Sequence, residues 1–357
     1  MSSSFGKNIK ISVFGQSHSR AIGVVIDGLP AGEKIDMEKV IKFMARRRPG
    51  ATDYVTQRRE EDRPQVLSGL VEGVTCGAPL AALIENTDTR SQDYDNLRYV
   101  PRPSHSDFPA FVKHEGFNDI RGGGHFSGRL TAPLCFAGAV CKQILERRGV
   151  TVGAHIDSIG TVKDSPFDPV NVTAEDLNAV GEKDLAVNDS QAGLEMVEEI
   201  KAAARERDSI GGRVECAAVG LPVGIGNPMF DGMENRLAAA IFGIPAVRGI
   251  EFGLGLEAST LRGSEHNDPF YYDGDKVKSR TNNHGGILGG MTTGMPLVFR
   301  VAFKPTSSIG KEQDSVDLVN KEDAKLNIVG RHDPCIVTRA VVVVEAVTAA
   351  VLLDSLL

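Results

Sequence analysis

The amino-acid sequence predicts a single α+β domain in which two similar strand–helix halves share one core. Short β-branched segments bounded by glycine and proline are typical of strands, and "IKISVFG" and "IGVVIDG" near the start are of this kind. Residues 127–147 are apolar on nearly every side, which indicates a buried helix. The pattern Gly-Leu-Pro-x-Gly occurs near the start of each half, as "GLPAG" and "GLPVG", each after a strand and before a helix.

In the first half, the two strands precede a helix that the sequence delimits at both ends. Asp36 is placed to cap a helix over 37–48. Pro49 ends it after three arginines, which lie where the helix dipole favours positive charge. In the buried segment 127–147, Pro133 is tolerated only near a first turn, so that helix begins a few residues after Ser127 or kinks there.

In the second half, the pattern predicts an amphipathic helix over 192–208, then a strand over 212–219 and a helix over 230–244. The expected apolar face of the first of these helices consists of Leu194, Val197, Ile200 and Ala204. The terminal run "AVVVVEAVTAAVLL" contains Glu345 and is too short to cross a bilayer, so we interpret it as a buried strand followed by a helix. No long linker separates the halves, which favours one domain over 1–357 with long functional loops.

Composition excludes several classes of partner and location. The formal net charge of −7 argues against nucleic acid as a partner, so any anionic ligand must be bound by a local basic cluster. The five cysteines are scattered and lack zinc-ligand spacing, which is typical of a reduced, cytoplasmic compartment. The start of the chain has no apolar stretch of signal length, and we expect neither export nor membrane insertion.

The loop "RGGGHFSGR" at 121–129 is the first candidate for function. Glycines let the backbone approach a ligand closely, and a following helix offers unpaired N–H groups, so the loop suits an anion. A glycine-rich turn with a solvated arginine is the structural alternative. Three histidines lie in comparable loops, His18 in "GQSHS", His105 in "RPSHSD" and His332 in "GRHDP". They suit proton transfer, whereas a metal site is disfavoured because no HxH or HExxH spacing is present.

Arginines gather at these same loops and predict a pocket for a ligand with several negative charges. They are Arg46 to Arg48, Arg58, Arg59, Arg102, Arg121, Arg129 and Arg331. Ion pairs with acidic residues are the alternative, and we expect them for Arg58 and Arg59, which precede two glutamates. The segment "KPTSSI" at 304–309 adds a lysine and three hydroxyls, which suit a phosphate or a ring cofactor. Neither a Rossmann fingerprint nor a P-loop is present.

Ten of these segments occur in the order seen in the chorismate synthase family, and the sequence resembles that family over essentially its whole length. The segments are "GQSHS", "RRRPG", "TQRREED", "IENTDTRSQDY", "RPSHSD", "RGGG", "RDSIGG", "NHGGILGG", "KPTSSI" and "GRHDPC". The resemblance implies a β-α-β sandwich of antiparallel sheets around long helices, with an internal pseudo-repeat. It also implies a cytoplasmic homotetramer.

The activity that the resemblance implies is a carbon–oxygen lyase of the shikimate pathway, acting in aromatic amino acid biosynthesis. Such enzymes convert 5-enolpyruvylshikimate 3-phosphate to chorismate and phosphate by a 1,4-anti elimination that requires reduced FMN. The substrate carries a phosphate and two carboxylates, which explains why an acidic protein gathers arginines. The sequence leaves open whether the chain reduces its own FMN with NADPH or uses an external reductant.

By the same resemblance, His18 is the acid near the leaving phosphate, and His105 protonates or orients the flavin. Ser17 and Ser127 match proton-relay serines, and Asp333 matches an acidic residue near the flavin. The matching substrate-binding arginines are Arg47 or Arg48, Arg102 and Arg129. The matching FMN-binding positions are His125, Phe126, Ser127, Ala246, Gly289, Lys304, Pro305, Thr306, Ser307, Ser308 and Arg331.

The sequence departs from the family pattern mainly in the glycine-rich loop. His125, Phe126, Gly128 and Leu130 stand where the family has Arg, Ser, Ala and Glu, and Asp53 stands where Arg is common. Loss of the arginine weakens a phosphate contact unless His125 is protonated. A flavin-binding homologue without lyase activity therefore stays an alternative. A phosphate-ester hydrolase or transferase with a histidine nucleophile is disfavoured, since the sequence indicates no acidic partner for the histidines.

Overall fold

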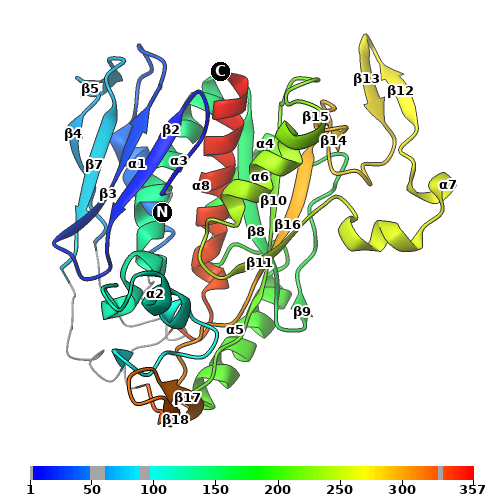
Figure 1. Cartoon of the computed structure of the whole chain (residues 1–357). Helices are drawn as coiled ribbons and strands as arrows, with labels where there is room; N and C mark the ends of the chain where they lie inside the picture. Colours follow the sequence, from blue (N-terminus) through cyan, green and yellow to red (C-terminus); the bar gives the residue numbers. More distant parts are fainter. Residues whose placement is uncertain (1–2, 49–60, 88–96, 329–332) are drawn as a thin grey trace.

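In the computed structural model, two antiparallel sheets of five strands stand on either side of two long helices (Figure 1). The structure describes residues 3–48, 61–87, 97–328 and 333–357. The first sheet has the order β1-β2-β3-β7-β4, with strands at Ser4–Phe5, Lys10–Gly15, Ala21–Asp27, Leu80–Glu85 and Gln65–Ser68. The second has the order β11-β16-β10-β8-β9, with strands at Val247–Phe252, Leu297–Phe303, Gly212–Val219, Thr151–Ile159 and Val162–Lys163.

The helices α3 (Thr131–Arg147) and α8 (Val337–Leu356) pack against each other between the sheets, and both contribute to one hydrophobic cluster with strands of both sheets. The approach is close, because a methyl group added to Gly138 of α3 would lie 2.3 Å from the Cα of Ala346. The predicted late start of the buried helix is confirmed. Residues Gly128–Leu130 form a separate 3₁₀ turn, η3, and Pro133 lies in the first turn of α3.

The prediction of a terminal strand is wrong, since the valine run lies wholly within α8. Valine favours strands only weakly, and burial on nearly every side of a helix outweighs that preference. Glu345 of α8 is 1% exposed and is paired with Arg46 and Lys142. Burial alone would raise the pKa of Glu345, but these two cations outweigh burial and lower it.

Two predicted amphipathic helices are present, with two corrections. The first ends at Ala45, so the three arginines expected in its last turn lie after the helix. Helix α1 (Met37–Ala45) is capped by Asp36, whose side chain accepts from two backbone amides of the first turn. Helix α5 (Ser190–Arg205) buries Ala192, Gly193, Met196 and Ile200, whereas Leu194 is 65% exposed. The buried face is therefore rotated from the one expected, because Met196 rather than Leu194 lies above Ile200.

Smaller elements connect this framework. The remaining helices are α2 (Asp107–Lys113), α4 (Ala174–Gly181), α6 (Met233–Ile241) and α7 (Gly263–His266), with 3₁₀ turns η2 (Arg121–Phe126), η4 (Met229–Asp231) and η5 (Gly255–Thr260). Two-stranded pairs are β5 (Leu70–Val71) with β6 (Val74–Thr75), β12 (Phe270–Asp273) with β13 (Lys276–Ser279), β14 (Ile287–Leu288) with β15 (Met291–Thr292), and β17 (Gln313–Asp317) with β18 (Glu322–Leu326). Among the described helices, none has the length and apolar character that a membrane span requires.

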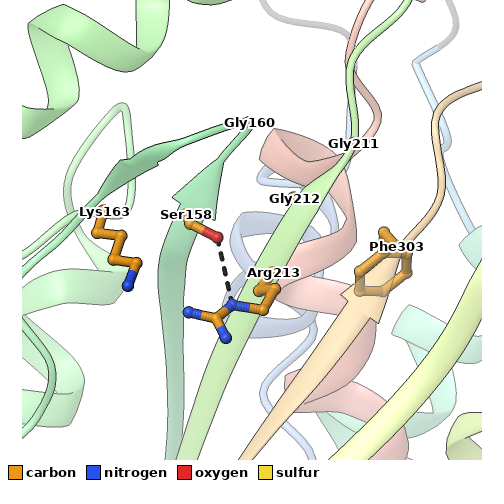
Figure 2. Close-up of a pocket in the computed structure, with 7 residues that line it drawn as sticks. All are labelled: Ser158, Gly160, Lys163, Gly211, Gly212, Arg213 and Phe303. Atoms are coloured by element: carbon orange, nitrogen blue, oxygen red, sulfur yellow. Dashed lines mark hydrogen bonds between the residues drawn. The ribbon is translucent and has the colours of Figure 1, made fainter.

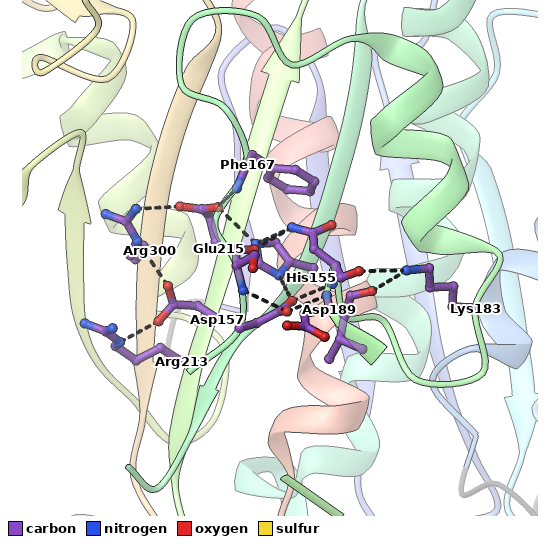
Figure 3. A network of polar contacts seen from close by, with 12 residues as sticks. His155, Asp157, Phe167, Lys183, Asp189, Arg213, Glu215 and Arg300 are labelled. Carbon is purple, nitrogen blue, oxygen red and sulfur yellow. Dashed lines mark hydrogen bonds and ion pairs between the residues drawn. The ribbon is translucent and has the colours of Figure 1, made fainter. Parts of the chain in front are cut away.

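A buried polar network fastens the segment between β9 and α5 to the second sheet (Figure 3). His155 of β8 is 0% exposed, and its ring nitrogens lie 2.8 Å from Oδ2 of Asp164 and 3.0 Å from Oε2 of Glu215. Burial would lower the pKa of His155, but the two carboxylates outweigh burial and raise that pKa to about 8. The imidazole is therefore protonated at neutral pH and acts as a buried counter-ion.

Candidate functional site

The glycine-rich loop passes directly against two of the predicted catalytic histidines. A methyl group added to Gly122 would lie 2.4 Å from Oγ of Ser17 and 2.6 Å from Cε1 of His18. A methyl group on the next residue, Gly123, would lie 3.5 Å from Nε2 of His105. Both glycines have positive φ, 59° and 83°, which other residues rarely adopt. The loop therefore brings His18 and His105 to consecutive positions of one bare backbone.

His105 is held by a carboxylate that the sequence analysis did not identify. Its Nδ1 lies 2.6 Å from Oδ1 of Asp107 and 3.1 Å from Nη2 of Arg102. Because the shorter contact is to a carboxylate, which only accepts, we assign the proton to Nδ1, and Nε2 faces Gly123. Asp107 also accepts from Nε and Nη2 of Arg102 at 2.7 and 2.9 Å. Burial would raise the pKa of Asp107, but these contacts hold it well below its usual range. The expectation that the histidines lack an acidic partner is therefore wrong for His105.

Burial is the largest influence on the pKa of His105 and lowers it, and the nearby Arg102 acts in the same direction. Asp107 opposes this effect without cancelling it. The ring is therefore mainly neutral near pH 7, with Nε2 as a proton acceptor on the side of the glycine loop.

Ser17 and His18 lie on the other side of that loop, both buried. The backbone N–H of Ser17 donates to the carbonyl of Gly124 at 3.0 Å, which fixes the two loops together. Within the described part of the chain, the Ser17 hydroxyl is buried with no hydrogen-bond partner, so it is available to a bound molecule.

Both ring nitrogens of His125 have hydrogen-bond partners within the protein. Its Nδ1 donates to the carbonyl of Gly15 at 2.7 Å, and its Nε2 lies 2.8 Å from Oγ of Ser3. These contacts tie the glycine loop to the first sheet. Phe126 follows it and is 38% exposed. Ser127 caps the turn η3 and accepts from the backbone N–H of Arg129.

Two of the predicted substrate arginines meet at a single carboxylate. Arg47, after α1, and Arg129, in η3, form ion pairs with opposite oxygens of Asp62. Burial would raise the pKa of Asp62, but the two guanidinium groups outweigh burial and lower it. Their neighbour Arg46 turns away to Glu345 and is structural. Arg48 is half-buried, and its Nε has no hydrogen-bond partner among the described residues.

The segment from Lys304 to Ser308 follows β16 and packs against the loop of Arg102 and His105. Arg102 donates to Oγ of Ser308 at 3.1 Å, and Oγ of Ser307 donates to the carbonyl of Ser104 at 2.9 Å. Nζ of Lys304 donates to Oγ of Ser307 at 2.9 Å. The backbone of this segment is also fixed at its start, because the N–H of Lys304 donates to the carbonyl of Ala246 at 3.0 Å.

Asp333 joins this segment to the arginine cluster. Its backbone carbonyl accepts from Thr306 at 2.9 Å, and its Oδ2 accepts from Arg339 at 2.7 Å. Arg339 also donates from Nε to the carbonyl of Arg47 at 2.9 Å. Burial, followed by the repulsion from Arg47, lowers the pKa of Arg339. The predicted cofactor segment and the predicted substrate arginines are thus parts of one connected site.

A few predicted residues lie elsewhere. Gly289 precedes Gly290, whose carbonyl accepts from the backbone N–H of the first residue of α6. Arg121 forms an exposed pair with Asp119. Four predicted residues lie outside the described residues: Arg58, Arg59, Arg331 and His332, as does the departure at Asp53.

Four residues of the site were not predicted from the sequence: Asp62, Asp107, Arg339 and Asn86, whose Oδ1 accepts from Nε of Arg129 at 3.0 Å. Three of them stand in the matched segments "TQRREED", "IENTDTRSQDY" and "RPSHSD". Asp107 could have been found, because an acidic residue two positions after a histidine can reach its ring. Asp62 could not, since its partners are brought to it only by the fold.

An open pocket of about 410 Å³ lies at the end of the second sheet where β8 and β16 end and β10 begins, and it contains none of the predicted site residues (Figure 2). It is lined by Ser158, Gly160, Lys163, Gly211, Gly212, Arg213 and Phe303. Arg213 is already held by Asp157 at 2.7 Å. Among the described residues, no group of three or more His, Cys, Asp or Glu side chains is arranged to hold a metal ion.

Comparisons with known proteins agree with one another. A family model for chorismate synthase matches residues 9–357. The chorismate synthase of Thermococcus kodakarensis is 46% identical over 352 residues, which span 99% of this chain and 97% of the relative. That of Dehalococcoides mccartyi strain BAV1 is 46% identical over 358 residues, with 99% and 96% covered.

A solved structure described as a crystal structure of chorismate synthase is also similar. It superposes with a TM-score of 0.78 at 26% sequence identity, over 99% of this chain and 92% of that structure. The similarity therefore covers both sheets and the helices between them.

Proposed function

The chain belongs to the chorismate synthase family, and on this premise we propose that it converts 5-enolpyruvylshikimate 3-phosphate to chorismate and phosphate by 1,4-anti elimination with reduced FMN. The observation that carries the proposal is the glycine loop, which joins His18 to His105 beside a cluster of buried arginines. A phosphate and two carboxylates require such a cluster, and departure of phosphate is assisted by a proton donor. The enzyme is a lyase by this proposal.

We assign each side chain a role from its position in the site. His18 and Ser17 supply a proton on one side of the loop, where the leaving phosphate would lie. His105, oriented by Asp107, holds or moves a proton at Nε2 on the other side. Arg102 and the pair Arg47 and Arg129 bind the anionic groups of the substrate. Burial of these groups excludes water, which strengthens each electrostatic contact.

The residues fit FMN, judged by the chemistry of the donor set. Burial lowers the pKa of Lys304, and the positive charges of Arg248 and Arg102 lower it further. A phosphate would relieve this repulsion, and the hydroxyls of Thr306 to Ser308 offer donors beside it. Reduced FMN held by these residues would supply electron density and a site of proton acceptance next to the substrate. NADPH is a candidate reductant, and an external reductant is the alternative.

We further infer a cytoplasmic homotetramer, on the strength of the family resemblance. The α+β fold with two sheets and two intervening helices supports description as one β-α-β sandwich domain over 1–357. The two Gly-Leu-Pro-x-Gly turns, which follow β3 and β10, support an internal pseudo-repeat.

Anaerobic phosphate release with and without chemically reduced FMN tests the function. We expect release only with reduced FMN, and loss of at least a hundredfold in turnover for His18→Ala. Release without flavin would favour a hydrolase or transferase. FMN binding without any release would mean that the departures at His125 and Phe126 have left a flavin-binding homologue without lyase activity.

A further inference from the structure

The carboxylate of Asp62 occupies the place between Arg47 and Arg129 where an anionic ligand would bind. Each guanidinium group pairs with a different oxygen of this one carboxylate. The three residues are between 2% and 5% exposed. Asp62 also has φ of +48°, in the left-handed region that aspartate adopts only occasionally. A buried carboxylate in that conformation persists because the two arginines hold it there.

A ligand oxyanion that binds between Arg47 and Arg129 meets the Asp62 carboxylate already there. Each nitrogen of the Arg129 guanidinium already donates one hydrogen bond, since Nε is also bonded to Oδ1 of Asn86 at 3.0 Å and Nη2 to the carbonyl of Glu85 at 3.3 Å. Two arginines facing one carboxylate form the arrangement that proteins use to bind carboxylate or phosphate ligands. A ligand oxyanion at this fork therefore has to replace the Asp62 carboxylate.

We propose that Asp62 is an internal substitute for a substrate oxyanion: it closes the fork of Arg47 and Arg129 in the ligand-free enzyme and is displaced when the substrate binds. The identity of the substrate rests on the proposed function, whereas the exchange at the fork does not. The exchange keeps one negative charge between two buried guanidinium groups at every stage. It thereby avoids leaving either arginine buried without a counter-ion.

This role makes a prediction that a merely structural ion pair does not. A competing carboxylate lowers ligand affinity, so its removal strengthens binding even though it destabilises the ligand-free protein. If Asp62 only positions the arginines for a ligand that binds elsewhere, its removal weakens both binding and stability. The two roles therefore predict opposite changes in the dissociation constant, Kd.

The test compares Asp62→Asn, which keeps the shape and removes the charge, with wild type by calorimetry. The probes are 5-enolpyruvylshikimate 3-phosphate, malonate and inorganic phosphate, of which the last two separate carboxylate from phosphate recognition. We expect the Kd of the substrate to fall by about tenfold to a hundredfold in the variant, the factor carried by one charge-assisted hydrogen bond. Equal or weaker substrate binding by the variant would overturn the proposal.

Glu33→Gln is a matched control, because Glu33 also bridges two arginines, Arg147 and Arg148, at the other end of α3. We expect its Kd values to equal those of wild type. Should substrate fail to bind wild type while malonate or phosphate binds with the predicted dependence on Asp62, the proposed function fails and the exchange stands. If no probe binds either protein, the exchange is overturned.

A second measurement needs no variant and covers the case in which Asp62→Asn does not fold. Hydrogen–deuterium exchange of wild type is compared with and without saturating substrate, in peptides that contain residues 61–64. Displacement of Asp62 predicts faster exchange of these amides when ligand is bound. Unchanged or slower exchange there would contradict displacement.

Discussion

Substitution of Gly122 by alanine tests most sharply whether the bare loop positions the catalytic groups. The added methyl group would lie 2.4 Å from Oγ of Ser17 and 2.7 Å from Nδ1 of His18, well inside contact distance. It would also hold an alanine at φ of +59°, which costs about 1–2 kcal/mol. Relief of the clash costs roughly another 1–3 kcal/mol. We therefore expect the free energy of unfolding to fall by about 2–5 kcal/mol.

The effect on catalysis should exceed the effect on stability. Because the clash is with the side chains themselves, Ser17 and His18 have to move, and a displacement of about 1 Å can reduce turnover a hundredfold. Urea unfolding and turnover with reduced FMN measure the two effects separately. Gly128→Ala is the control, since among the described residues no heavy atom beyond its two chain neighbours lies within 4 Å of a methyl group there. Turnover of Gly122→Ala within threefold of wild type would refute the positioning role of the loop.

Three further changes test other parts of the structure. Asp107→Asn should reduce turnover by about tenfold or more, because His105 loses the carboxylate that fixes its tautomer; wild-type kinetics in the variant would contradict this. The stability that His155 contributes, about 2 kcal/mol from a pKa raised to about 8, should be present below pH 6.5 and disappear as the pH rises to about 8. Urea unfolding from pH 6 to 9 measures it, and His155→Gln should flatten the profile. Glu345→Gln should cost about 3–5 kcal/mol of unfolding free energy by leaving two partly buried cations without their counter-ion, and a loss below 1 kcal/mol in urea would contradict this expectation.

Local signals in the sequence predicted much of the framework. The Asp36 cap depends on contacts within one turn, and Pro133 restricts the backbone of its own helix, so both were predictable. The valine run of α8 was assigned to a strand because its helical state depends on burial against α3. The exposed Leu194 likewise reflects how α5 lies on the sheet, which no helical period can specify by itself.

The site was predictable as a set of residues but not as a geometry. The motifs indicated His18, His105 and the arginines, because each lies in a short segment with recognisable chemistry. The links between segments were not predictable, since Asp62 and Arg339 meet their partners only through the packing of α1, η3 and α8. The hydrogen bond from His125 to the carbonyl of Gly15 was likewise not predictable, because only the fold brings these two residues together.

The proposed lyase activity is tested most directly by anaerobic incubation of the wild-type enzyme with 5-enolpyruvylshikimate 3-phosphate and chemically reduced FMN. Chorismate and phosphate are measured together. We expect both products to appear in equal amounts, at a rate that depends on reduced flavin. Phosphate without chorismate, or neither product from an enzyme that binds both ligands, would contradict the proposed activity.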